Sequence, residues 1–259
     1  SFEAKLPNAL GVHTIEQQSL KDLVPYIDWS PFFRSWDLHG KYPEILTDEV
    51  VGEQAQSLFQ DAQEMLNQIV EDNWLTAKAR FGLFPAHAVG DDIEIYTTDD
   101  RSQVSARWLT LRQQLKKRRG LPNLALADFV APKTSGKKDY VGAFCVTTGF
   151  GTDEKAQAFE AENDDYSCIM VKALSDRLAE AFAEYLHERV RRKYWGYAVE
   201  ESFSNEELIQ EKYKGIRPAP GYPACPDHLE QKTLWKLMEV EEILGVQLTE
   251  SLAMWPASS

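Results

Sequence analysis

The sequence has few cysteines and no long apolar run. It contains three cysteines in 259 residues, and no two of them form a C-x-x-C pair, which argues against a disulfide framework and against a zinc ribbon. This sparse use of cysteine fits a reducing compartment, so we expect a cytoplasmic protein. The longest apolar runs are far too short to cross a bilayer, and the N-terminus lacks a basic segment followed by an apolar one. We therefore expect no association with membranes.

An excess of basic side chains is also missing. The chain has 28 basic and 41 acidic side chains, which give a formal net charge of −13. Because such a charge repels phosphate backbones, we do not expect nucleic acid as a partner. An acidic surface suits solubility or docking to a basic protein face, but it identifies no partner by itself.

Linkers and repeats are absent too. No stretch is rich enough in serine, glycine or proline to form a long linker, and no repeat of fixed period occurs. A chain of this length can bury a core without disulfides or structural metals. We therefore expect one domain over residues 1–259, in which residues 1–23 form a mostly extended N-terminal arm.

Helical periodicity marks two long segments, in which apolar residues recur every three or four positions. They are Asp48–Asp72 and Ser167–Trp195, and the second carries charged side chains on its other face. Shorter helical patterns follow, two of them opened by capping-box residues. The shorter helices expected are Val104–Lys117, one that begins after Ser204, and Leu229–Leu244.

Segments with strand-like composition are separated by turn-forming residues. The strands expected are Arg80–Phe84, Asp92–Tyr96, Leu124–Val130, Tyr140–Thr148 and Gln247–Trp255. Helices and strands are mixed without a regular βαβ alternation. The sequence therefore predicts an α+β fold, with a mixed or antiparallel sheet flanked by helices.

Motifs of common enzyme classes are absent. Gly149-Phe150-Gly151 is followed by Glu154, where a dinucleotide-binding loop requires a third glycine. No G-x-x-x-x-G-K-S/T loop and no G-x-S-x-G elbow occur. The sequence thus argues against the commonest dehydrogenase, ATPase and hydrolase folds.

Two short patterns resemble parts of metal sites. Glu184-x-x-His187 has the spacing of half a di-iron site, but no second copy is present, so a solvated helix face is the better interpretation. Cys225 and His228 could supply two zinc ligands, but no second pair stands at finger spacing. We therefore expect no metal site.

The most informative segment is GIRPAPGYPACPDH, at residues 215–228. Its four prolines fix φ and remove backbone donors, so we expect a stiff, non-helical loop with little freedom to lose when it binds a ligand. Arg217 offers a planar fork that matches a carboxylate, Gly221 permits close backbone approach, and Tyr222 provides an aromatic wall. These groups suit an amino-acid-like ligand, but a rigid turn in which Arg217 pairs with a nearby acid fits the same residues.

The pattern Arg217-x-x-x-Gly221-Tyr222 resembles the S-adenosylmethionine (AdoMet) motif in the reactivation domain of cobalamin-dependent methionine synthase. Further blocks resemble this family in the same order and cover nearly the whole chain. They are VPYIDWSPFF at 24–33, GKYPEIL at 40–46, GLFPAHAVGDDIEIY at 82–96, LADFVAP at 126–132, and DDYSCIMVKALSDRLAEAFAEYLHERVRRKYWGY at 164–197.

The resemblance implies a single α+β domain with a bent, mainly antiparallel sheet and flanking helices. It also implies that the domain binds AdoMet and supports reductive methylation of cob(II)alamin to methylcobalamin, which reactivates the synthase that transfers a methyl group from 5-methyltetrahydrofolate to homocysteine. The cobalamin would come from a module in cis or in trans. The electron would come from flavodoxin or a flavoprotein reductase.

The resemblance also assigns ligand contacts, with Arg217 on the AdoMet carboxylate. Asp28 would be an acidic contact and Glu180 would face the ammonium end, because carboxylates lower the cost of holding positive groups. Without the family, Asp28 would be a cap of the turn before Pro31, and Glu180 a surface partner of Lys172 or Arg177. The complete set implied is Asp28, Glu180, Arg217, Ala219, Gly221 and Tyr222.

Lys41 and Asp176 resemble positions near the interface with the cobalamin module. No catalytic residue is expected, because methyl transfer from a sulfonium depends on alignment rather than on a general base. In the family, the segment after TESLAMWPASS continues to an aromatic pair at the adenosyl site, whereas this sequence stops at Ser259. We therefore expect the C-terminus to be truncated relative to the family.

Two other functions remain open. A stand-alone AdoMet sensor or corrinoid chaperone would keep the ligand loop but would not regenerate methylcobalamin. An inert docking domain would not gain thermal stability from AdoMet, because only a ligand that binds the native state stabilises it.

Overall fold

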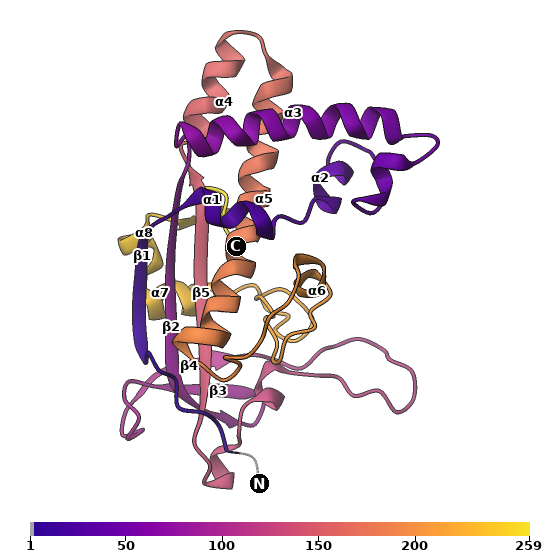
Figure 1. Ribbon diagram of the computed structural model, residues 1–259. Coiled ribbons are helices and arrows are strands. Elements are labelled where there is room, and N and C mark those ends of the chain that lie inside the picture. The colour runs from indigo at the N-terminus through magenta and orange to yellow at the C-terminus, as the bar shows by residue number, and fades with distance from the viewer. Residues whose placement is uncertain (1–2) are drawn as a thin grey trace.

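An antiparallel five-stranded sheet forms the middle layer of the computed structural model, which describes residues 3–259 (Figure 1). The long strand β2 (Thr76–Val89) is central. It pairs with β5 (Asp139–Phe150) along one edge, and with β1 (Gly11–Gln18) and then β3 (Asp92–Tyr96) along the other. The strand β4 (Val104–Leu109) pairs with β3, and both cross the end of β2 at a steep angle in Figure 1. The predicted bent, antiparallel sheet is confirmed.

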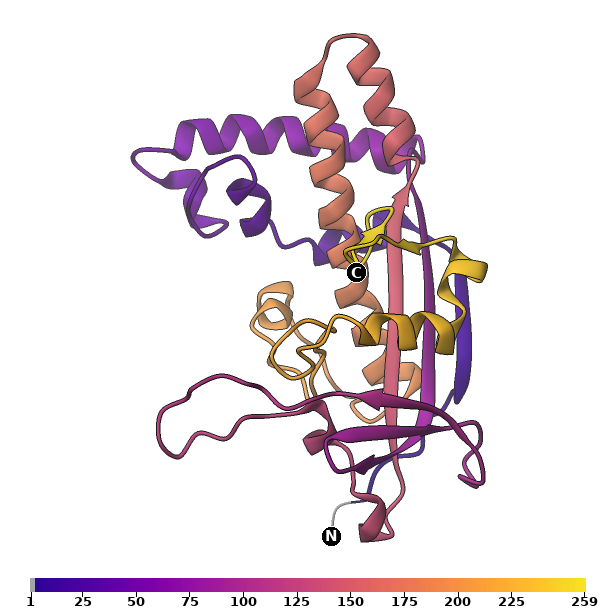
Figure 2. The ribbon, with the colours of Figure 1, turned by 180° about the vertical axis from the view of Figure 1, so that it is seen from behind.

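Helices cover both faces of this sheet. The longest, α5 (Asp165–Arg189), lies on one face and continues into a short π-helix, η5 (Val190–Tyr194). In Figure 2 the opposite face is covered by α7 (Glu230–Met238) and α8 (Val240–Leu244). The remaining helices are α1 (Leu20–Leu23), α2 (Ser30–Arg34), α3 (Gly52–Glu71), α4 (Thr152–Ala161) and α6 (Asn205–Ile209), with the 3-10 turns η1 (Val24–Tyr26), η2 (Glu44–Thr47), η3 (Leu126–Phe129) and η4 (Lys133–Ser135).

Alternating side chains of β2 divide the interior into two cores. Phe81 and Leu83 pack into the core under α5, whereas Phe84 lies in the core that contains Trp235 and Met238 of α7. Successive residues of a strand point to opposite faces of the sheet, so one strand serves both cores. The burial of each such large apolar side chain contributes about 1.5–3 kcal/mol. This packing holds α5 rigidly across the sheet.

The two long helices form as expected. The predicted segments Asp48–Asp72 and Ser167–Trp195 correspond to α3 and to α5 with η5. Asp164 caps α5, because its side chain accepts a hydrogen bond from the Ser167 N–H. The short helix after Ser204 forms as α6, and its capping box is complete. These elements are set by local signals.

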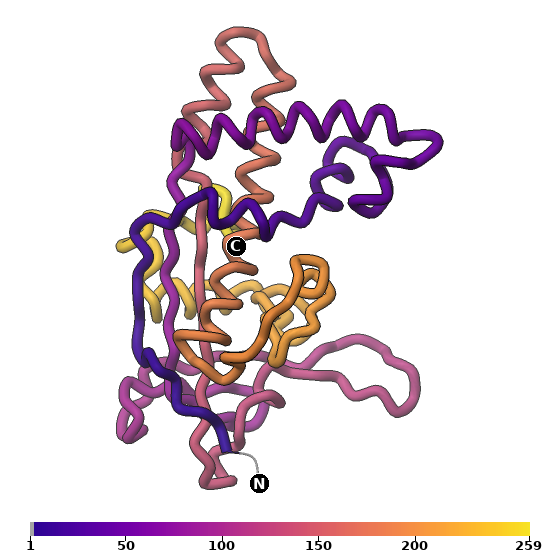
Figure 3. The backbone as a smooth tube through the Cα atoms, viewed as in Figure 1, coloured from indigo at the N-terminus to yellow at the C-terminus, as the bar shows by residue number. Residues whose placement is uncertain are grey.

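Three element predictions were wrong. Val104–Lys117 is not a helix, because Val104–Leu109 pairs with β3 as a strand and residues 110–125 form a loop that projects beside α6 (Figure 3). Leu124–Val130 is not a strand but contains the 3-10 turn η3. The predicted helix Leu229–Leu244 is broken at Glu239, whose φ of 52° separates α7 from α8.

The ends of the chain join the same sheet structure. Within the expected arm, β1 pairs with β2, while residues 1–2 lie outside the described part of the chain. The expected strand Gln247–Trp255 is a small hairpin of β6 (Gln247–Leu248) and β7 (Met254–Trp255). The last residue, Ser259, exchanges backbone hydrogen bonds with Val146 of β5. Among the described helices, none is long and apolar enough to traverse a bilayer.

Candidate functional site

The proline-framed segment 215–228 is a series of tight turns beside α5, as its composition predicts. The Gly221 N–H donates to the Cys225 carbonyl at 2.8 Å, and the Tyr222 N–H donates to the Ala219 carbonyl at 3.1 Å. Gly221 has a φ of 90°, and a Cβ added there would lie 2.2 Å from the nearest ring atom of His228. Glycine therefore meets both a conformational and a steric requirement.

Arg217 of this segment contacts an acid on α5. Its Nη2 atom lies 3.1 Å from Oε2 of Glu184. The pairing with a nearby acid that the sequence left open is thus present in the structure. The pair uses only one nitrogen and one oxygen, because Arg217 Nη1 and Glu184 Oε1 are buried without a hydrogen-bond partner among the described residues. The arginine therefore keeps donors available.

The expectation that Glu184 and His187 lie on a solvated helix face was wrong. Both side chains are buried, Glu184 with 8% and His187 with 7% of its surface exposed. The periodicity was correct for the helix, but Tyr213 and Arg217, from the chain after η5, pack against His187 and Glu184, which the sequence pattern did not indicate. Within residues 3–259, no three potential metal ligands cluster.

Burial controls the protonation of these two groups. It raises the pKa of the Glu184 carboxyl, although the positive charge of Arg217 opposes this effect. It lowers the pKa of His187 to about 2, and the charges of Arg217 and Arg191 add to the shift. His187 is therefore neutral at physiological pH. Its Nδ1 accepts a hydrogen bond from Arg191 Nη1 at 2.7 Å, since an arginine can only donate.

Arg191 makes a second connection between the end of α5 and the chain that leads into segment 215–228. Its side chain is wholly buried, and its Nε lies 2.7 Å from Oε2 of Glu201. Oε1 of Glu201 accepts the Lys214 N–H at 3.0 Å. The guanidinium also stacks over the Tyr213 ring, 4.2 Å from its centroid. The chain entering the 215–228 segment is thus fixed to the helix. Sequence reasoning missed Arg191, Glu201 and Tyr213, although the spacing of Arg191 places it on the same helix face as Glu184 and His187.

The other predicted contacts lie on elements around this site. Asp28 is half-buried and accepts the Ser30 N–H at 3.0 Å, which is the turn-capping role considered as an alternative. Glu180 is exposed, one helical turn from Glu184, and it has no ion pair with Lys172 or Arg177 in the described structure. The Asn205 amide of α6 donates to the Ile27 carbonyl, which joins the Asp28 segment to α6.

Acidic side chains continue along α5. Asp176, Glu180 and Glu184 follow each other at intervals of four residues, so they share one face of the helix. The pKa of Asp176 is raised, first by desolvation, while Arg177 lowers it and Glu180 raises it. Lys41, on the segment before η2, is exposed and pairs with Glu206 of α6 at 3.2 Å. In Figure 1, α2 and α6 lie on the same side of α5.

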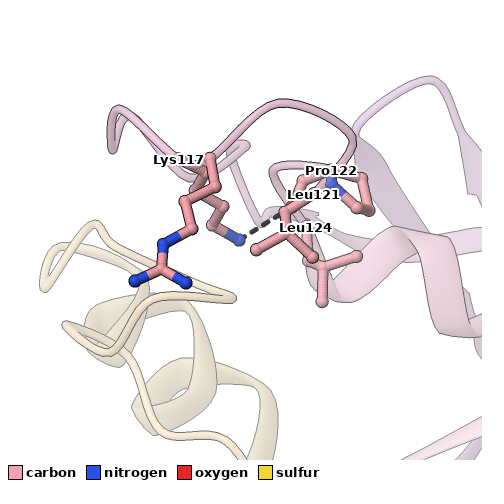
Figure 4. Close-up of a pocket in the computed structure, with 5 residues that line it drawn as sticks. Lys117, Leu121, Pro122 and Leu124 are labelled. Carbon is pink, nitrogen blue, oxygen red and sulfur yellow. Dashed lines mark hydrogen bonds between the residues drawn. The ribbon is translucent and has the colours of Figure 1, made fainter.

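A pocket on the loop between β4 and η3 lies outside this cluster. It is lined by Lys117, Arg118, Leu121, Pro122 and Leu124, and Figure 4 shows the Lys117 ammonium directed at the Pro122 carbonyl, which it reaches at 2.8 Å. None of the residues predicted to contact a ligand lines it. Its lining contains no acid for a sulfonium or ammonium group, so we do not assign it to the candidate site.

Two comparisons with known proteins identify similar chains. The family model described as "Vitamin B12 dependent methionine synthase, activation domain" matches residues 19–259. A solved structure described as "Crystal Structure of the MetH Reactivation Domain bound to AdoHcy" is 58% identical to this chain, with a TM-score of 0.94. The match covers 99% of this chain and 79% of that one.

Proposed function

Because this chain belongs to the family of activation domains of vitamin B12 dependent methionine synthase, we propose that it binds AdoMet and supports the reductive methylation of cob(II)alamin. The solved relative at 58% identity is bound to AdoHcy, which is AdoMet without its methyl group. The proposal assigns the ligand to the side of α5 that carries Glu184 and Glu180 and faces Arg217.

The observation that carries this proposal is that only one terminal nitrogen of the Arg217 guanidinium has a hydrogen-bond partner among the described residues. One nitrogen contacts Glu184, while Nη1 is buried and has no hydrogen-bond partner among the described residues. A buried N–H without a partner is costly. The carboxylate of AdoMet would satisfy it with a charge-assisted hydrogen bond, which is among the stronger kinds in proteins.

The remaining contacts suit the positive end of the ligand. Asp28 uses Oδ1 to cap its own turn, so its other oxygen is available to a sulfonium or an ammonium group. Glu180 is exposed on the same helix face as Glu184, where its carboxylate would face the ammonium group. The backbone at Ala219 and Gly221 and the exposed ring of Tyr222 would shape the adjoining pocket.

The role of this chain in the reaction is to position the methyl donor. Methyl transfer breaks the sulfonium S–CH₃ bond and leaves AdoHcy, and one electron is needed to reduce cob(II)alamin before it accepts the methyl group. No residue of the chain has to move a proton, because the step depends on alignment. We propose that a cobalamin-binding module, in cis or in trans, presents the acceptor near Lys41 and Asp176. Flavodoxin or a flavoprotein reductase would supply the electron.

Calorimetric titration with AdoMet tests the binding proposal. We expect Arg217→Ala to weaken binding by about 10- to 100-fold, the scale of a lost hydrogen bond to a charged group. Arg107→Ala is the matched control, because Arg107 also pairs with a buried carboxylate, that of Glu94, at 2.8 Å and outside this site. Equal affinities for wild type and Arg217→Ala would contradict the role of Arg217.

The second part of the proposal is tested by turnover. The chain is mixed with a cob(II)alamin-loaded module, AdoMet and a reductant, and methylcobalamin is followed by its absorption spectrum. Formation of methylcobalamin that requires this chain supports reactivation. AdoMet binding without methylcobalamin formation indicates a sensor or chaperone instead.

A further inference from the structure

The side chain of Glu184 is a buried carboxylate that contacts Arg217 of segment 215–228. It comes from α5, and its Oε2 lies 3.1 Å from Nη2 of Arg217, 33 residues further along the chain. We propose that Glu184 is a positioning residue, which holds the guanidinium of Arg217 so that Nη1 faces the ligand carboxylate. This inference rests on the proposed function.

The geometry of the pair supports positioning rather than simple neutralisation. A guanidinium and a carboxylate can form two parallel hydrogen bonds, which would use both terminal nitrogens. Here a single contact forms, and Nη1 of Arg217 and Oε1 of Glu184 both remain without partners among residues 3–259. One terminal nitrogen of the arginine is therefore fixed by Glu184, while the other lacks a partner.

Arginine side chains have many rotamers. An arginine that is already fixed before the ligand binds therefore loses less conformational entropy on binding. The backbone before Arg217 is fixed by Glu201, which joins Arg191 of η5 to the Lys214 N–H. In addition, the Tyr197 hydroxyl donates to the Lys214 carbonyl at 3.0 Å. These contacts place the backbone, whereas Glu184 is the group that orients the side chain.

Burial and neighbouring charges act in opposite directions on the Glu184 carboxyl. Burial raises the pKa of this carboxyl and the charge of Glu211 adds to the shift, whereas the charges of Arg217 and Arg191 oppose it. His187, one turn along α5, contributes no charge, because it is neutral and accepts a hydrogen bond from Arg191. The carboxylate therefore faces two arginines, of which Arg217 is the one it contacts.

The test compares two ligands on three variants. AdoMet carries the carboxylate that Arg217 would hold, whereas 5′-methylthioadenosine has neither the carboxylate nor the ammonium group. We expect Glu184→Gln to weaken AdoMet binding about tenfold, the scale of one charge-assisted hydrogen bond, and to leave 5′-methylthioadenosine binding unchanged. In an Arg217→Ala background, Glu184→Gln should have no further effect on AdoMet, because the residue acts through the arginine.

Glu94→Gln is the matched control. Glu94 is also a buried carboxylate, and it pairs with Arg107 and Lys133 at 2.8 Å on β3. The control is expected to lower the melting temperature without changing the affinity for either ligand. If circular dichroism shows that Glu184→Gln does not fold, Glu184→Asp replaces it, and the same two affinities are measured. Its shorter side chain withdraws the carboxylate from Arg217.

The outcomes separate this inference from the proposed function. Absence of AdoMet binding in the wild type, or equal binding by Arg217→Ala, contradicts the proposed function. If Arg217→Ala weakens AdoMet binding while Glu184→Gln binds it equally or more tightly, the function stands and the positioning role is overturned. An equal loss for AdoMet and 5′-methylthioadenosine in Glu184→Gln also overturns it, because that loss is structural.

Discussion

Arg191 and Glu201 form a buried ion pair, in which Nε of Arg191 lies 2.7 Å from Oε2 of Glu201. No part of the Arg191 side chain is exposed, and Glu201 is nearly covered. The same carboxylate accepts the Lys214 N–H through its other oxygen. One acid therefore connects the end of α5 to the backbone that leads to Arg217.

Removing this acid should destabilise the fold strongly. We expect Glu201→Ala to lower the free energy of unfolding by about 3–5 kcal/mol, because it leaves the Arg191 charge buried without its partner. Urea denaturation measures the change. The control is Glu206→Ala, which breaks the exposed pair with Lys41 and should cost less than about 1 kcal/mol. Similar losses in both variants would contradict the importance of burial.

Acid should weaken the fold through His187. Its pKa in the folded chain is about 2, against about 6.5 in the unfolded chain. Below pH 6.5 the unfolded state therefore binds a proton that the folded state does not bind, and stability falls as the pH falls. Between pH 6.5 and 5 the loss should reach about 2 kcal/mol.

The variant His187→Gln isolates this contribution, because glutamine can still accept the hydrogen bond from Arg191 but does not titrate. Denaturation of both proteins at pH 7 and pH 5 should show a smaller pH dependence for the variant. A wild type and variant with the same pH dependence would indicate that His187 is protonated in the folded state.

Substitution of Gly221 should affect binding more than folding. Alanine at this position would have to adopt a backbone φ of 90°, and its Cβ would collide with the His228 ring. The His228 side chain is exposed and can move aside. We expect Gly221→Ala to lose about 1–2 kcal/mol of stability from the left-handed backbone alone, and to bind AdoMet more weakly.

Gly90→Ala serves as the comparison, because Gly90 has a φ of 64° and open space where a Cβ would stand. It should show a similar fall in stability by denaturation but unchanged AdoMet affinity by calorimetry. Equal affinity in both variants would show that the turn at Gly221 does not contact the ligand.

The three cysteines should be unreactive in the native chain. All are free and buried, and burial raises the pKa of the Cys145 thiol to about 12 and that of the Cys225 thiol to about 11. Because the thiolate is the reactive form, the folded protein should react slowly with Ellman's reagent at pH 8. Unfolding in guanidinium should release three equivalents. Rapid reaction of one equivalent in native buffer would show that a cysteine is accessible.

The sequence by itself determined the elements that depend on short-range signals. Apolar spacing predicted α3 and α5, and the Ser204–Glu207 capping box predicted where α6 begins. The prolines of segment 215–228 predicted a rigid loop, since proline and glycine act on the local backbone whatever surrounds them. The assignment of Arg217 to a ligand carboxylate came from the family motif and is still a prediction.

Tertiary structure decided what local patterns left open. Val104–Leu109 is a strand because the preceding strand, β3, offers it a hydrogen-bonded partner, and this pairing overrides a weak helical pattern. The local pattern predicted Glu184 and His187 as surface residues. In the structure they are buried, because the chain after η5 covers them and brings Arg217, 30 or more positions further along, into contact with Glu184. Periodicity shows which residues share a helix face, but only the packing of distant segments determines whether that face meets water.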